Sequence, residues 1–168
     1  MKELIERLDN WLREYRIDFY GELNKSATDK EIEQIENEAG LSLPPEFKEL
    51  LLWKNGQSSD CLATFHPLSN EMFVSSTSMV NDMKEMKELL KYGDIEKWSS
   101  SWAPFLDNGG GDMTSIDLST GEIVTRDHET EEIVILYKNI YLWLSDLVQV
   151  LSTNNFSEWD IVECRKNS

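Results

Sequence analysis

The stretch that decides the fold is WAPFLDNGGGDMTSIDL, from Trp102 to Leu118. An apolar segment opens it, a glycine run occupies the middle, and a second segment with apolar residues closes it. This order predicts a strand, a turn and an antiparallel strand. Further strands are expected at 122–126, after the tight turn at 119–121, and at 133–136, across the acidic connection 127–132. The four strands together predict an antiparallel meander.

Helical spacing of apolar residues precedes and follows this meander. Amphipathic helices are predicted at 4–15, 28–39, 45–53, 79–90 and from about Asn139 onward. Thr28 and Glu31 form a capping box, Pro45 opens the third helix, and Ser78 is the expected N-cap of the fourth. Short extended pieces are expected at Phe65 and 72–74.

Helices on both sides of an antiparallel sheet make a single α+β domain. We assign this domain to residues 1–152 and treat 153–168 as a C-terminal tail. The full chain of 168 residues is 40% hydrophobic, which is enough to fill one core and excludes wholesale disorder.

The charge balance restricts the partners. Acidic residues number 32 and basic residues 16, so the net charge is −16 at pH 7. A field of this sign repels nucleic acid and anionic lipid, and it attracts a basic partner. We therefore expect no direct contact with nucleic acid or membrane.

The cysteines and the N-terminal residues favour the cytosol. Cys61 and Cys164 lie far apart and form no CxxC motif, which excludes a disulfide scaffold. Acids within the first seven residues, and the lack of a long apolar run, argue against a secretory signal. We expect a cytoplasmic protein.

Short fragments in a fixed order run through most of the chain, from Leu4 to Leu151. They are Leu8-x-x-Trp11-Leu12, Ala27-Thr28-Asp29-x-Glu31-Ile32, Leu43-Pro44-x-x-Phe47, Trp53-x-Asn55-Gly56-Gln57, Trp102-x-Pro104-Phe105, Asn108-Gly109-Gly110-Gly111-Asp112, Ile116-Asp117-Leu118, Gly121-Glu122-Ile123 and Asp127-His128. Each fragment alone is common. Their order resembles the SUKH superfamily, which contains bacterial toxin-immunity proteins and fungal cell-wall-synthesis regulators of the SMI/KNR type.

The resemblance implies an SMI/KNR-like α+β fold and a role in binding proteins rather than in catalysis. Bacterial members typically neutralise a cognate toxin, often a secreted nuclease. We therefore expect an immunity protein that binds a basic toxin domain; the alternative is an intracellular regulatory scaffold like the fungal relatives. The chain departs from the pattern in the short Ser119-Thr120 turn and in lacking a tyrosine-glycine feature near Phe65.

The motif residues that carry the resemblance are interpreted as structural. They are Trp53, Asn55, Gly56, Pro104, Phe105, Gly109, Gly110, Gly111, Asp112 and Asp117.

The glycine-rich turn between Asp107 and Asp112 is the segment most suggestive of metal chemistry. If Asp107 opened an EF-hand, the third and fifth ligands would be glycines and the twelfth would be Leu118, so this register fails. A phosphate-binding loop requires a lysine after its glycines, and none follows them here. The simpler interpretation is structural, because glycine permits positive φ and Asp112 or Asp117 can bond loop amides.

The two histidines give little support to an enzyme. His66 precedes Pro67 in a turn-like context. Neighbouring carboxylates raise the pKa of His128 and favour its cation, which is a poor general base. No nucleophile elbow, Walker loop, HExxH motif or dinucleotide fingerprint is present. We expect no catalysis, no metal and no cofactor.

One acidic cluster is predicted to contact the basic partner. It consists of Asp127, Glu129, Glu131 and Glu132. These carboxylates lie on a strand connection where the sequence indicates no structural task, and loops on a rigid sheet commonly carry binding specificity.

The tryptophans fall into two groups. Trp53, Trp102 and Trp143 fit core positions. Trp98 and Trp159 fit either exposed interface anchors or packing under a loop. The oligomeric state is left open.

Overall fold

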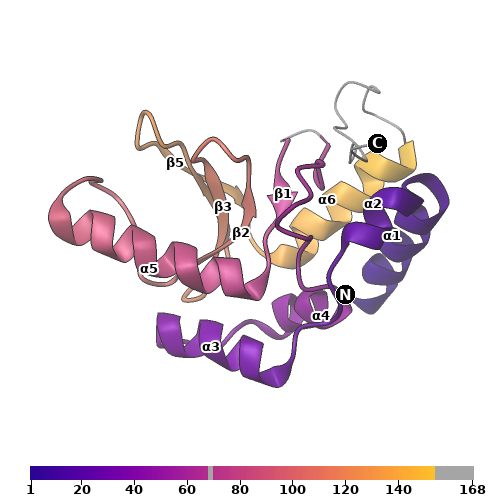
Figure 1. Ribbon diagram of the computed structural model, residues 1–168, viewed down its shortest axis with the longest axis horizontal. Coiled ribbons are helices and arrows are strands. Elements are labelled where there is room, and N and C mark those ends of the chain that lie inside the picture. Colours follow the sequence, from indigo (N-terminus) through magenta and orange to yellow (C-terminus); the bar gives the residue numbers. More distant parts are fainter. Residues whose placement is uncertain (68–69, 154–168) are drawn as a thin grey trace.

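The computed structural model describes residues 1–67 and 70–153. Its helices are α1 (Lys2–Tyr15), α2 (Ile17–Glu22), α3 (Asp29–Ala39), α4 (Pro45–Trp53), α5 (Ser76–Tyr92) and α6 (Ile140–Thr153). Its strands are β1 (Met72–Phe73), β2 (Trp102–Asp107), β3 (Met113–Asp117), β4 (Ile123–Arg126) and β5 (Ile133–Tyr137). Figure 1 shows α1, α2 and α6 gathered at one end of the molecule, and α5 with β5 toward the other. The predicted α+β fold is confirmed.

The five strands form one antiparallel sheet in the order β1-β2-β3-β4-β5. The predicted meander is therefore confirmed, and β1 extends it on one side. Ser115 of β3 pairs with Pro104 of β2 and with Val124 of β4. The register shifts between Pro104 and Leu106, and such an irregularity tolerates a proline that lacks an N–H.

Aromatic side chains join the sheet to α4 and α6 in the main core. Phe105 of β2 packs edge to face against Phe47, with ring centroids 5.6 Å apart, and against Trp143 at 5.0 Å. Phe65 stacks on Phe73 of β1 at 4.9 Å. The apolar residues whose spacing predicts α6 are all buried, namely Ile140, Trp143, Leu144, Leu147, Val148 and Leu151. The main core thus covers one side of the meander with helices from both ends of the chain.

A second, smaller cluster contains Trp98 and Trp102. Their rings pack edge to face at 5.2 Å, beside Met86 and Val124. Trp98 is buried, so it is not an exposed interface anchor. Trp159 lies outside the described residues.

The helix ends confirm some sequence signals and correct one. Thr28 and Glu31 form the predicted capping box, and Gly40 ends α3 in the left-handed conformation. Ser75 caps α5, with its Oγ accepting from the backbone N–H of Ser78. The prediction of Ser78 as the N-cap is therefore wrong, because two serines three positions apart offer the same capping chemistry.

The segment after α1 holds a helix, α2, that the sequence pattern does not predict. Arg16 adopts a non-helical conformation between the two helices, and the chain then turns Phe19 completely into the core. The Arg16 guanidinium lies over the Phe19 ring at 4.2 Å and donates to the carbonyl oxygen of Thr64 at 2.7 Å. Tyr15, which helical spacing places on the buried stripe of α1, is 63% exposed at this break.

Two of the motif residues hold neighbouring elements through hydrogen bonds. The Trp53 indole Nε1 donates to Asp9 Oδ1 at 2.8 Å, which joins α4 to α1. Asp117 accepts from the Trp102 indole Nε1 at 3.2 Å and from the backbone N–H of Ser119 at 2.9 Å. These contacts give Trp53 and Asp117 positions inside the scaffold.

Asn55 connects α3 with α5. Its Nδ2 donates to Glu31 Oε1 at 3.1 Å, and its Oδ1 accepts from the backbone N–H of Ser76 at 2.8 Å. Asn55 is buried, so the loss of either bond would leave a polar group without water.

Gln57 connects the following loop with β1. Its Nε2 donates to the carbonyl oxygens of Cys61 and Ala63, at 2.7 and 2.9 Å. Its Oε1 accepts from the backbone N–H of Phe73 at 2.9 Å. One buried amide therefore fixes three backbone groups.

Gly56 lies between these two side chains at a very close backbone approach. It has φ +70°, and a Cβ on it would stand 2.5 Å from the nitrogen of Ser75 and the carbonyl carbon of Val74. Only glycine fits both the conformation and the space.

We expect Gly56→Ala to lower the free energy of unfolding by more than about 3 kcal/mol, because left-handed strain adds to an overlap with backbone. Gly40→Ala is the matched control. Gly40 has φ +69°, but no atom lies within 4 Å of an added Cβ, so this substitution should lower the free energy of unfolding by only about 1 kcal/mol. Urea denaturation measures both. Equal losses would show that residues 74–75 are not held against Gly56.

Candidate functional site

Two loops meet at one end of the sheet, namely the β2–β3 loop and the β4–β5 turn. We call residues 107–112 and 127–132 the acidic end. The backbone N–H and the ring Nδ1 of His128 lie 2.9 and 2.7 Å from Asp112 Oδ1. Gly111 packs so tightly here that an added Cβ would lie 3.1 Å from the His128 ring. The two loops therefore form one unit.

The hydrogen bond that His128 donates to the Asp112 carboxylate is the main reason why the pKa of His128 is raised. The same bond lowers the pKa of Asp112. The direction predicted for His128 is confirmed, but its main cause is an acid from the other loop, with Glu129 and Asp127 adding less.

Asn108 shapes the β2–β3 loop. Its Oδ1 accepts from the backbone N–H groups of Gly110 and Asp112, and its Nδ2 donates to Asp112 Oδ2 at 2.7 Å. Asp107 Oδ1 accepts from the N–H of Gly109 at 2.7 Å. Both oxygens of Asp112 are thus engaged, Oδ2 within this loop and Oδ1 with His128 of the other loop. Within residues 1–67 and 70–153, no group of three His, Cys, Asp or Glu side chains is arranged to hold a metal.

The four acids predicted to contact the partner have different environments. Asp127 Oδ1 accepts from the N–H groups of Glu129 and Thr130, at 2.9 and 2.7 Å, and from the Thr130 hydroxyl at 2.9 Å. The bonds from Thr130 are the main reason why the pKa of Asp127 is lowered. Asp127 therefore builds the turn on which the cluster lies.

Glu131 is also engaged inside the protein. Its Oε1 forms an ion pair with Arg126, which is buried, and its Oε2 accepts from the backbone N–H of Lys97 at 3.1 Å. Burial opposes ionisation of Glu131, but the bonds from Arg126 and Lys97 outweigh it and lower the pKa.

The interpretation that all four acids lack a structural task is therefore wrong for Asp127 and Glu131. A run of acids looks uniform in the sequence, whereas the buried partner Arg126 becomes apparent only in the fold. Glu129 and Glu132 remain exposed.

A cavity of about 230 Å³ adjoins the acidic end. Asp82 from α5 and Asp107 from β2 line it, together with Leu62, whose side chain is 72% exposed. Burial, followed by the negative charges of Asp107 and Glu85, raises the pKa of Asp82 to about 6. Of the described residues, no lysine or arginine lines this cavity. It presents two carboxylates and an apolar rim.

The sequence motifs do not single out Asp82. The available signal is its place beside the apolar stripe of α5, between the buried residues Met79 and Met83. An acid at the border of a buried stripe is either solvated or part of a cavity. The packing of α5 in the fold decides between these alternatives and makes Asp82 part of the cavity.

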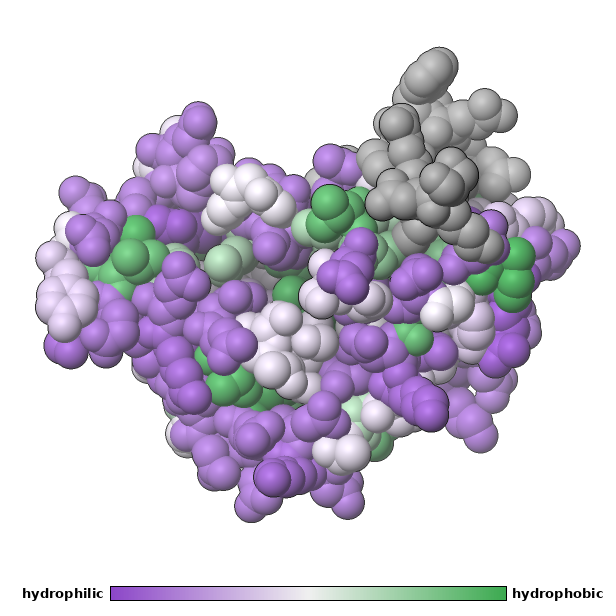
Figure 2. All heavy atoms as spheres, viewed as in Figure 1, coloured by the Kyte–Doolittle hydropathy of each residue, from purple (hydrophilic) through white to green (hydrophobic). Residues whose placement is uncertain are grey.

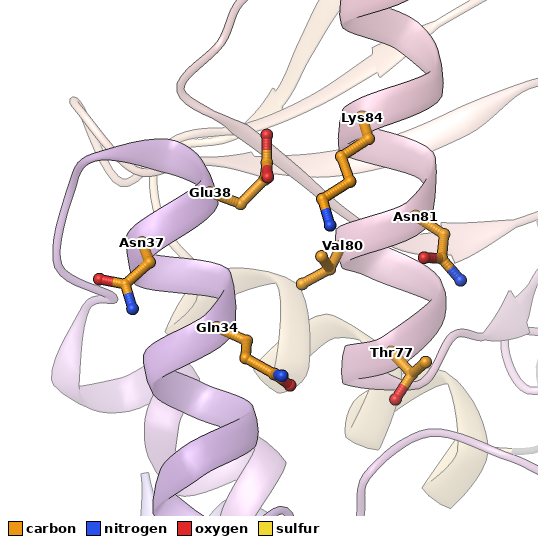
Figure 3. A pocket seen from close by; sticks show the side chains of 7 residues that line it. All are labelled: Gln34, Asn37, Glu38, Thr77, Val80, Asn81 and Lys84. Atoms are coloured by element: carbon orange, nitrogen blue, oxygen red, sulfur yellow. The ribbon is translucent and has the colours of Figure 1, made fainter.

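A second groove, of about 370 Å³, lies between α3 and α5. Figure 3 shows Glu38 of α3 and Val80 and Lys84 of α5 pointing into the space between the two helices. The Glu38 carboxylate binds Lys87 Nζ at 2.6 Å. This groove pairs acids with bases, so it lacks the excess negative charge of the acidic end.

The face of the molecule seen in Figure 2 is mainly hydrophilic, and its hydrophobic parts form small separate patches.

Comparison with family models matches residues 26–159 to the SMI1 / KNR4 family (SUKH-1). The chain belongs to this family. The resemblance drawn from the motif order is confirmed. No curated protein compared with the chain matches it.

The SMI1 / KNR4 match includes the acidic end and the cavity residues Asp82 and Asp107, whereas α1 and α2 precede it. Proteins of the family are generally non-enzymatic immunity or regulatory proteins. The site residues and the boundary at residue 152 stay predictions, and residues 154–168 lie outside the described ones.

The location of this family member stays a prediction too. No helix among the described residues is long and apolar enough to cross a membrane. Cys61 is disulfide-bonded. A chain with two cysteines is no disulfide scaffold, but disulfides are uncommon in a reducing cytosol.

Asp82→Asn should stabilise the protein by about 1 kcal/mol at pH 7.5, after allowance for partial exposure of the carboxylate. Above pH 6 the carboxylate is ionised in both folded and unfolded chains, so the folded chain bears the cost of burial beside Asp107. Well below pH 4 it is protonated in both, and the gain should vanish. Asp60→Asn, at an exposed loop position, is the control and should change little at either pH. Urea denaturation across this range tests the sign; a gain that grows toward low pH would contradict it.

Proposed function

We propose that this chain is an immunity protein that binds and neutralises a basic toxin domain, with a nuclease as the expected chemistry. The observation that carries the proposal is the acidic end, where Glu129 and Glu132 stand exposed and where Asp107, together with Asp82, lines a cavity. Family membership supports a binding role. Neutralisation is placed in the cytosol, because nucleic acid is the target of such a toxin.

The electrostatics suit this partner class. A nuclease presents cationic groups to hold phosphates, so a chain of net charge −16 attracts it over long range. At close range, a lysine or arginine in the cavity would neutralise Asp82 and Asp107, two like charges that otherwise repel each other. Leu62 offers an apolar contact at the same place. The net charge thus accelerates association, and the cavity provides a defined binding position for one basic side chain of the partner.

The proposed mechanism is steric and needs no catalysis by this chain. His66 is buried, and burial lowers its pKa to about 4. His128 is held by Asp112. Both histidines therefore have surroundings that suit structure better than proton transfer at neutral pH.

We expect Glu129→Gln combined with Glu132→Gln to slow association with the toxin domain encoded next to this chain several-fold at about 50 mM salt, and less at about 300 mM. The matched control is Glu3→Gln with Glu6→Gln, which removes the same charge from exposed positions on α1. Surface plasmon resonance with immobilised toxin domain measures the rates. Circular dichroism checks that both variants are folded.

Equal slowing by both pairs would mean that net charge alone acts and that the acidic end is not the docking surface. If the parent chain neither binds the toxin domain nor protects cells that express it, immunity toward that toxin is refuted. Binding without protection would favour a regulatory scaffold.

A further inference from the structure

The edge strand β5 is apolar and exposed. Its residues Ile133, Val134, Ile135 and Leu136 have exposed fractions of 36, 41, 58 and 44%. β5 pairs with β4 on one side and is the last strand of the sheet in the described part of the chain. Natural edge strands are usually short, charged or covered, since their free N–H and C=O groups accept another strand. Residues 133–137 contain no charge.

Opposite charges stand at the two ends of this strand. Glu132 precedes it and Lys138 follows it, and both are exposed. The ion pairs formed among the described residues include neither of them. Tyr141 and Leu142, on the first turn of α6, are exposed by 46 and 44% as well.

We propose that β5 pairs with β5 of a second copy of this chain. In an antiparallel arrangement centred on Ile135, the Glu132 end of each strand lies beside the Lys138 end of the other. Two opposite-charge contacts then flank an apolar centre made of the same residues from both copies. Such a self-complementary surface closes into a two-fold dimer and leaves no free edge at β5. A parallel arrangement would instead place like charges together, so the charges select the antiparallel one.

This interface is small, and two chains of net charge −16 repel each other over long range. The dimer is therefore weak. It should form only at high protein concentration and in salt that screens the repulsion between the two chains. The test is sedimentation equilibrium of the full chain up to about 0.5 mM in about 0.3 M NaCl. The parent mass should rise from 19.5 kDa toward twice this value.

Ile135→Lys should keep the chain monomeric, because it places a charge at the centre of the apolar strand. Tyr92→Lys is the matched control: Tyr92 is 71% exposed at the end of α5, and its replacement should leave the dimer unchanged. Glu132→Lys and Lys138→Glu should each weaken association at least several-fold, and the double exchange should restore it. Thermal melts verify that each variant is folded.

A parent chain that stays monomeric over the whole range would overturn the proposal and leave β5 to another kind of partner. A dimer that survives Ile135→Lys, or a double exchange that fails to restore association, would place the interface elsewhere. None of these measurements involves a toxin, so their outcome is independent of the proposed function.

Discussion

The close backbone approach at Gly56 is the constraint on which the rest of the structure depends. The added methyl group of any other residue would stand 2.5 Å from the backbone of Val74 and Ser75. On either side, the Asn55 and Gln57 amides bond the start of α5 and the backbone of β1. These contacts fix α5 and β1 relative to the N-terminal helices. The cavity that contains Asp82 and Asp107 is bounded by the same two elements, so its shape follows from this turn.

The carboxylates of the acidic end fall into two groups: those that hold the two loops together and those that are exposed to solvent. The carboxylate oxygens of Asp112, Asp127 and Glu131 are already engaged inside the protein. Asp112 bonds Asn108 and His128, Asp127 bonds the amides of its own turn, and Glu131 pairs with Arg126. Because these bonds hold the two loops as one unit, Glu129 and Glu132 are presented from a fixed backbone. A preorganised surface loses less conformational entropy on binding than a flexible loop would. Asp82 differs from these acids, because it is partly buried and no cation among the described residues lines the cavity beside it. Its ionised carboxylate therefore lowers the stability of the free protein. A basic partner group in the cavity would relieve this cost.

Much of the fold is predictable from the sequence, because its determinants are local. Alternating segments with glycine turns identify the meander, and the stripe of α6 identifies its buried face. The errors arise where tertiary contacts decide. Ser75 and Ser78 are equivalent caps in the sequence, and the bond that the Ser76 backbone N–H donates to Asn55 Oδ1 favours the earlier start of α5. The roles of Glu131 and Asp82 depend on Arg126 and Asp107, partners that only the fold brings near. The run at 133–136 predicts a strand, but not that it lies at an exposed edge.

The central claim is that the acidic end of the sheet is the docking surface for a basic partner. The most direct measurement is hydrogen–deuterium exchange of this chain, free and in complex with the toxin domain encoded next to it. If the acidic end docks the partner, exchange should slow in peptides covering 107–113 and 126–133, with no change over 34–38 and 77–81 in the groove between α3 and α5. Protection confined to that groove, or to α1 and α2, with the two loops unchanged, would contradict it.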